Sequence, residues 1–241
     1  MSGHSKWATT HRQKAIVDAK RGATFTKLGN MIALAARSGT DPTLNTTLAM
    51  AMEKARASNM PKDNIQRAID RAADKNAATL EEATYEAYGP GGIGIIVEIA
   101  TDNKNRTYPE VRTALTKHGA TMADGGSVLF QFTRKGVIIV KETGEDALLS
   151  VLDAGADDAI EEEGEIVVYT DHKDLAKVRT AIISAGLTVL DAELRHVPNA
   201  TIAITDPEVA RKIENILDAV ESIDEVVGVH INGDFQVDAA A

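Results

Sequence analysis

The stretch GGIGIIVEIA at residues 91–100 decides the class of fold that this sequence can adopt. It is apolar over about ten residues, which suits a buried strand, whereas a membrane-spanning helix needs about 18 or more. Its first two residues complete the turn sequence Gly89-Pro90-Gly91-Gly92, and residues 85–88 before the turn are predicted to form a shorter strand. We therefore expect a sheet-containing body to begin near residue 84.

Upstream of this body the sequence predicts three helices and no strand. Apolar residues recur at helical spacing over residues 16–37, and the segment 38–42 ends that helix. A second apolar face consists of Leu44, Leu48, Ala51, Met52 and Ala55, and Pro61 lies in the first turn of a third helix. Few of these side chains are large, so we expect the helices to pack against the rest of the protein or against a partner.

Downstream of the strand, helices and strands alternate. Thr107 and Glu110 are a predicted capping pair, and Thr205 and Glu208 are another. Two strands are predicted at residues 127–133 and 226–231. Between them, residues 135–197 show the order βαββαβ, which is the ferredoxin-like arrangement.

The element order predicts an insertion. Residues 84–133 supply strand, helix and strand, and residues 199–233 supply the second helix and its strand. We therefore predict an α+β protein with an N-terminal three-helix domain and two α/β (ferredoxin-like) domains, one inserted in the other. The predicted domains are residues 1–79, residues 80–134 plus 198–241, and residues 135–197. Two sequential domains with a C-terminal appendage are the alternative.

The net charge of −10 hides two opposite parts. Residues 1–75 hold 13 basic and six acidic residues, net +7, which leaves 13 basic and 30 acidic residues, net −17, on residues 76–241. Because salt screens charges beyond about 8 Å, a basic end can meet a polyanion despite a distant acidic body. The alternative is that the asymmetry serves only solubility.

Other features exclude several functional classes. The absence of cysteine rules out disulfides, thiol catalysis and thiolate zinc sites, and it fits a reducing cytoplasm. We find neither a signal peptide nor a membrane span, so we expect a cytoplasmic protein. The six histidines are scattered, the turn at residues 89–92 lacks the Lys-Ser/Thr of a phosphate loop, and no nucleophile, base and orienting group come together. We expect a binding protein, not an enzyme, with no metal and no cofactor.

Basic residues gather at the N-terminus around Trp7, the only tryptophan of the chain. The tryptophan either stacks on a nucleotide base or anchors the arm on the α/β body. Lys20 and Lys27 are spaced to share one helix face that could follow phosphates. The candidate nucleic-acid-binding residues are Lys6, Trp7, His11, Arg12, Lys14, Lys20, Arg21 and Lys27.

Several motifs resemble the YebC/PmpR family, in order from residue 3 to about residue 235. They are GHSKW at 3–7, DAKRG at 18–22, FTKL at 25–28, NMPKDNI at 59–65, YGPGG at 88–92, TDNKNRT at 101–107 and GGSV at 125–128. The resemblance implies a cytoplasmic protein with one helical and two α/β domains, and no enzymatic activity. Bacterial members are described as DNA-binding transcriptional regulators or ribosome-associated factors, and mitochondrial relatives as translational activators.

Two functions therefore stay open, and a plain protein-interaction module is a third. In the first, the basic arm and first helix bind duplex DNA while the acidic body contacts RNA polymerase or an effector. In the second, the same elements bind ribosomal or transfer RNA on the ribosome. The loops 89–92 and 102–107, with Asn103, Lys104 and Arg106 as possible contacts, would then reach a functional centre. No base-reading helix is visible, and the oligomeric state is open.

Overall fold

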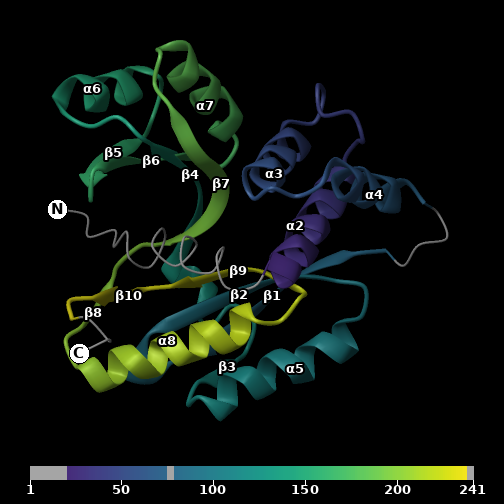
Figure 1. Cartoon of the computed structure of the whole chain (residues 1–241). Coiled ribbons are helices and arrows are strands. Elements are labelled where there is room, and N and C mark those ends of the chain that lie inside the picture. Colours follow the sequence, from purple (N-terminus) through teal and green to yellow (C-terminus); the bar gives the residue numbers. More distant parts are fainter. Residues whose placement is uncertain (1–20, 75–78, 238–241) are drawn as a thin grey trace. The chain divides into compact units, whose positions relative to one another are not determined.

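The computed structural model describes residues 21–74 and 79–237 and shows an α+β protein, as predicted (Figure 1). The chain forms two compact units, one of residues 1–132 and 198–241 and one of residues 133–197. A finer division of the first unit into a helical and a sheet domain stays a prediction.

Within the described residues 21–74 lie three helices, which we call the helical head: α2 (Arg21–Ala36), α3 (Thr46–Ala57) and α4 (Lys62–Ala73). The Asn45 side chain caps α3 by accepting a hydrogen bond from the Leu48 N–H at 3.0 Å. Leu44 precedes this cap and is 86% exposed, so its predicted place on the apolar helix face is wrong. The core of the head consists of Leu28, Ile32, Ala36, Leu48, Met52, Ala55, Met60, Ile65, Ala68 and Ile69.

The rest of the first unit, which we call the body, is built on an antiparallel sheet in the order β3-β1-β2-β9. Its strands are β1 (Glu81–Tyr88), β2 (Gly94–Thr101), β3 (Thr121–Ala123) and β9 (Val226–Ile231). Two helices, α5 (Lys104–Lys117) and α8 (Pro207–Glu221), cover one face (Figure 1). The short 3-10 helix η2 (Pro90–Gly92) joins β1 to β2, so no α-helix separates these strands.

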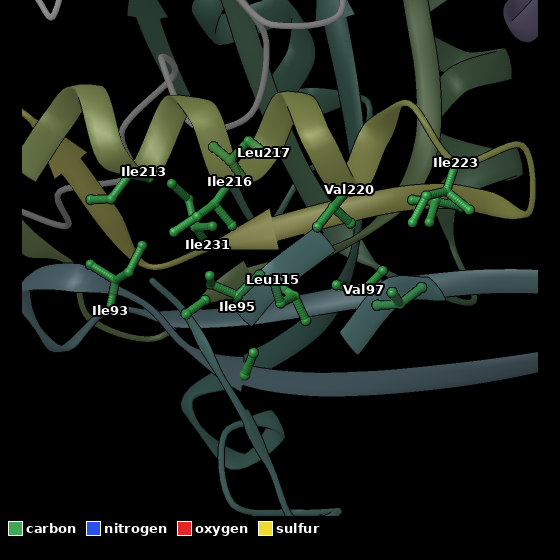
Figure 2. Close-up of a cluster of buried hydrophobic side chains, with 14 of the residues drawn as sticks. Ile93, Ile95, Val97, Leu115, Ile213, Ile216, Leu217, Val220, Ile223 and Ile231 are labelled. Atoms are coloured by element: carbon green, nitrogen blue, oxygen red, sulfur yellow. The ribbon is translucent and has the colours of Figure 1, made fainter. Parts of the chain in front are cut away.

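The main core lies between this sheet and its helices. Ile93, just before β2, and Ile95 and Val97 on β2 point toward Ile213, Ile216 and Val220 of α8 (Figure 2). Burial of one such side chain stabilises the fold by about 1.5–3 kcal/mol. Ile96, between Ile95 and Val97, is also fully buried, in a second cluster with Val128 and Phe132, so both faces of β2 are covered.

The C-terminal segment completes the sheet. β9 pairs with β2 from Ile95 opposite Ile231 to Ile99 opposite Val226. After β9, the short strand β10 (Gly233–Phe235) pairs in parallel with β8 (Ile202–Ile204). Residues beyond 198 thus pack on residues 81–101, far away in the sequence.

The second unit contains a sheet in the order β5-β6-β4-β7. Its elements follow the predicted βαββαβ order: β4 (Phe132–Val140), α6 (Glu145–Asp153), β5 (Asp158–Glu162), β6 (Glu165–Asp171), α7 (Leu175–Ser184) and β7 (Val189–Pro198). Arg195 on β7 is only 3% exposed and pairs with Glu193 and Asp191 of its own strand.

Three further local predictions are wrong. Residues 127–131 are not a strand: they hold the turn η3 (Leu129–Gln131), and β4 starts at Phe132. Helix α5 is capped by Asn103 and not by Thr107, whose buried hydroxyl lies 2.8 Å from the Thr101 hydroxyl. Helix α8 is capped by Asp206, which accepts from the Glu208 N–H at 2.8 Å.

Asn232 joins three segments of the body, and we call this contact the Asn232 bridge. Its side-chain oxygen accepts the Gly94 N–H at 2.7 Å, and its amide donates to the Gln131 side-chain oxygen at 2.7 Å. Its own carbonyl accepts the Ile202 N–H at 2.7 Å. The side chain is 2% exposed, so water cannot replace these partners.

Replacement of Asn232 by alanine leaves the buried Gly94 N–H without its acceptor, and we expect a loss of about 1–3 kcal/mol in the free energy of unfolding. Urea denaturation followed by circular dichroism measures this loss. Asn105→Ala, on the exposed first turn of α5, is the control and should stay within about 0.5 kcal/mol of the wild type. Equal stability of the two variants would contradict the role of the bridge.

Candidate nucleic-acid interface

Most of the predicted contact residues precede the described part of the chain. Lys6, Trp7, His11, Arg12, Lys14 and Lys20 lie outside the described residues. Arg21 is the first residue of α2, and Lys27 lies farther along the same helix. The described head, residues 21–74, holds eight basic and five acidic residues, net +3. More than half of the +7 therefore resides outside these helices.

Lys27 is engaged within the chain. Its ammonium donates to the backbone carbonyl of Glu221, in the last turn of α8, where unpaired carbonyls attract a cation. Burial lowers the pKa of Lys27, and the Glu221 and Asp224 carboxylates partly oppose that effect. A phosphate contact by Lys27 would have to replace this hydrogen bond, so its nucleic-acid role stays a prediction.

Two arginines of the head also bind acceptors on the body. The guanidinium of Arg71 lies 3.7 Å from the Asp102 carboxylate, and Arg37 donates to the Leu80 carbonyl. Arg71 also donates to the side-chain oxygen of Asn30, whose amide in turn donates to the Asp224 carbonyl, both at 3.4 Å. Sequence reasoning did not single out these arginines, because their partners lie far along the chain.

The three possible loop contacts have structural partners. Asn103 accepts the Arg106 N–H at 3.2 Å and so starts α5. Lys104 pairs with Glu81 at 2.7 Å. Arg106 pairs with Glu225 at 2.6 Å and with Asp102 at 3.0 Å, and these hydrogen bonds raise its pKa. Contacts of these residues with RNA stay predictions.

Two further cations of the head lie at helix ends on the surface. Arg56 at the end of α3 and Lys62 at the start of α4 are exposed. Farther along α4, Arg67 is bound to the Asp63 carbonyl and the Asn64 side chain, and Gln66 to Asp70. These four side chains of α4 are thus bound to other residues of the same helix.

The GGSV motif at residues 125–128 surrounds a buried carboxylate. Glu86 is 5% exposed and accepts the N–H groups of Gly126 at 2.5 Å, Val128 at 2.6 Å and Leu129 at 2.8 Å. Burial acts to raise the pKa of Glu86, but the three backbone hydrogen bonds outweigh it and the pKa is lowered. These N–H groups cannot join a sheet ladder, which explains why the strand predicted here is absent.

Neither a spanning helix nor a metal site occurs in the described parts of the chain. None of the helices in residues 21–74 and 79–237 is long and apolar enough to cross a membrane. Over the same residues, no three or more His, Asp or Glu side chains form a group that could hold a metal ion.

Two family models match the chain. The model described as the TACO1/YebC protein N-terminal domain matches residues 5–75, and the model described as the TACO1/YebC second and third domain matches residues 80–233. The two matches together cover most of the 241 residues.

Full-length relatives and a solved structure agree with these matches. Proteins called probable transcriptional regulatory proteins from Mycolicibacterium smegmatis and Latilactobacillus sakei are each 45% identical, over 100% and 97% of this chain and 98% of their own lengths. One from Frankia casuarinae is 44% identical over 99% of this chain and 97% of its own. The crystal structure of a conserved hypothetical protein from Aquifex aeolicus matches with a TM-score of 0.89 at 38% identity, and covers 98% of this chain and 100% of that one.

The lowered pKa of Glu86 makes a test by pH possible. A carboxylate whose pKa is lower in the folded state stabilises the fold above its unfolded pKa of about 4.3, and this contribution disappears as the pH falls through the folded value. We expect Glu86→Gln to lower the free energy of unfolding at pH 7 and to differ progressively less from the wild type below about pH 4.

Glu82→Gln, at an exposed position four residues earlier on β1, should show no comparable difference at either pH. Urea denaturation of the three proteins at each pH gives the comparison. A deficit in the Glu86→Gln variant that stayed constant as the pH fell would show that the ionised carboxylate does not hold the loop.

Proposed function

Because the chain belongs to the TACO1/YebC family, we propose that it regulates gene expression by binding a nucleic acid with its basic N-terminal end. The observation that carries this proposal is the division of charge, +7 on residues 1–75 and −17 on the remainder. A surface that neutralises phosphates needs clustered Lys and Arg, and residues 1–75 supply them. The relatives named probable transcriptional regulatory proteins support a regulatory role.

In this proposal the N-terminal arm and the start of α2 hold the phosphates. Lys6, Arg12, Lys14, Lys20 and Arg21 supply charge, Trp7 supplies a stacking surface, and His11 supplies a hydrogen-bonding ring. The acidic remainder of the chain, residues 76–241, discourages non-specific coating of nucleic acid and is left to contact a partner such as RNA polymerase. Regulation then follows from binding, with no catalysed reaction.

A ribosome-associated translation factor is the second candidate. Reading a DNA sequence takes a helix that offers free Arg, Asn or Gln side chains to base edges. On α4 the side chains of Asn64 and Arg67 bind each other, and Gln66 binds Asp70. Because these side chains already bind partners on the same helix, they favour a contact with the phosphates and the shape of an RNA over one that reads the base edges of DNA.

Two measurements distinguish the candidates. Co-sedimentation with ribosomes that RNase abolishes would contradict a purely transcriptional role. Nanomolar binding to a promoter duplex that survives about 200 mM salt would contradict a purely ribosomal one.

The double variant Lys20→Glu with Arg21→Glu tests the basic end directly. We expect it to lose binding to both duplex DNA and ribosomal RNA, because two cations become two anions at the proposed contact. Lys173→Glu with Lys177→Glu makes the same change in net charge at exposed positions near and on α7, and it should bind like the wild type. Electrophoretic mobility shifts at several salt concentrations measure both variants. Equal affinity of the two variants would remove α2 from the interface.

A further inference from the structure

The contact between the helical head and the body includes hydrogen bonds and an ion pair that join donors on the head to acceptors on the body. The head offers donors to the contact: the ammonium of Lys27, the amide of Asn30 and the guanidinium of Arg71. The body offers oxygen acceptors: the carbonyls of Glu221 and Asp224 and the carboxylate of Asp102.

The acceptors lie in an acidic part of the body. Asp102, at the end of β2, also binds Arg106, and Arg106 reaches Glu225 in the turn between α8 and β9. The carboxylates of Glu221 and Asp224 are close enough to Lys27 to favour its charged form. The body therefore presents negative charge and oxygen acceptors to the donors of the head, as the phosphates of a nucleic acid would.

The contact is of a kind that a competing polyanion can displace. The Arg71 and Asp102 side chains are 40% and 28% exposed and 3.7 Å apart, so solvent and salt weaken their attraction. Lys27 is partly buried and held by a carbonyl rather than by a full ion pair, and its burial disfavours the charge. A phosphate brings a full negative charge to the same donors.

We propose that Lys27 and Arg71 form a masked phosphate-binding surface, which the body occupies in the free protein and which a bound nucleic acid takes over. The proposal rests on the proposed function, and it adds a regulation of that same binding. In the free protein Asp102 and the end of α8 hold the two cations and lower the apparent affinity for nucleic acid. Binding at the N-terminal arm raises the local concentration of phosphates, which then displace the body.

Asp102→Asn tests the competition, because it removes the charge that holds Arg71. We expect this variant to bind random-sequence duplex DNA or ribosomal RNA about two- to fivefold more tightly than the wild type. Asp124→Asn is the matched control, since it removes one exposed acidic charge elsewhere on the body. Arg71→Gln should weaken binding and reduce the salt dependence by about one phosphate contact. Circular dichroism melting curves establish that each variant is folded.

A distance measurement tests the displacement itself. The chain has no cysteine, so Ala57→Cys on α3 and Asn215→Cys on α8, both exposed, take one spin label each. We expect the distribution of distances between the labels to change when the nucleic acid binds, and to change in the same direction at high salt without it.

The outcomes separate the two proposals. Wild-type affinity in both the Asp102→Asn and Asp124→Asn variants, or a distance distribution that bound nucleic acid leaves unchanged, would overturn the masked surface alone. Failure of the wild type and of Asp102→Asn to bind either probe would overturn the proposed function. Tighter binding by Asp102→Asn only, together with a changed distance distribution, is the result that supports the masked surface.

Discussion

The pairing of β9 with β2 is the constraint on which the rest of the first unit depends. It places β9 beside β2, which begins at Gly94. Helix α8, which precedes β9 in the chain, packs on one apolar face of the same sheet. The Asn232 bridge fixes this return by binding the Gly94 N–H, the Gln131 side chain and the Ile202 N–H. The chain between the two distant segments of the body, residues 133–197, forms a compact unit of its own.

The elements that the sequence predicted best are those whose signal is local and apolar. The strand expected at residues 93–100 is β2, the strand expected at residues 226–231 is β9, and the order βαββαβ recurs in the second unit. The errors lie where polar side chains compete. Asn103 and Thr107 could each start α5, and the choice depends on Thr101, a buried neighbour of Thr107 on another element. The bonds of Glu86 to a loop about 40 residues away likewise have no periodic signature.

The candidate site shows even more strongly that contacts between distant residues cannot be predicted from the local sequence. Charge counting located a basic end, and this result needs no structure because it depends on composition alone. It could not separate cations that are available from cations that the fold already uses. Lys27 shares a helix face with Lys20 by spacing, yet it binds a carbonyl 194 residues away. Arg106 belongs to a recognisable motif, yet Glu225 and Asp102 hold it. Pairing between distant residues decides which positive charges remain for a ligand.

The central claim is that nucleic acid meets this protein at one end. Hydrogen–deuterium exchange of the full chain, with and without bound ribosomal RNA or duplex DNA, tests it most directly, since it compares every segment in one experiment. The account expects slower exchange confined to the N-terminal segment, α2 and α4, and faster exchange in the turn between α8 and β9 where Lys27 is released. Slower exchange in residues 133–197 with no change in the first 74 residues would contradict it.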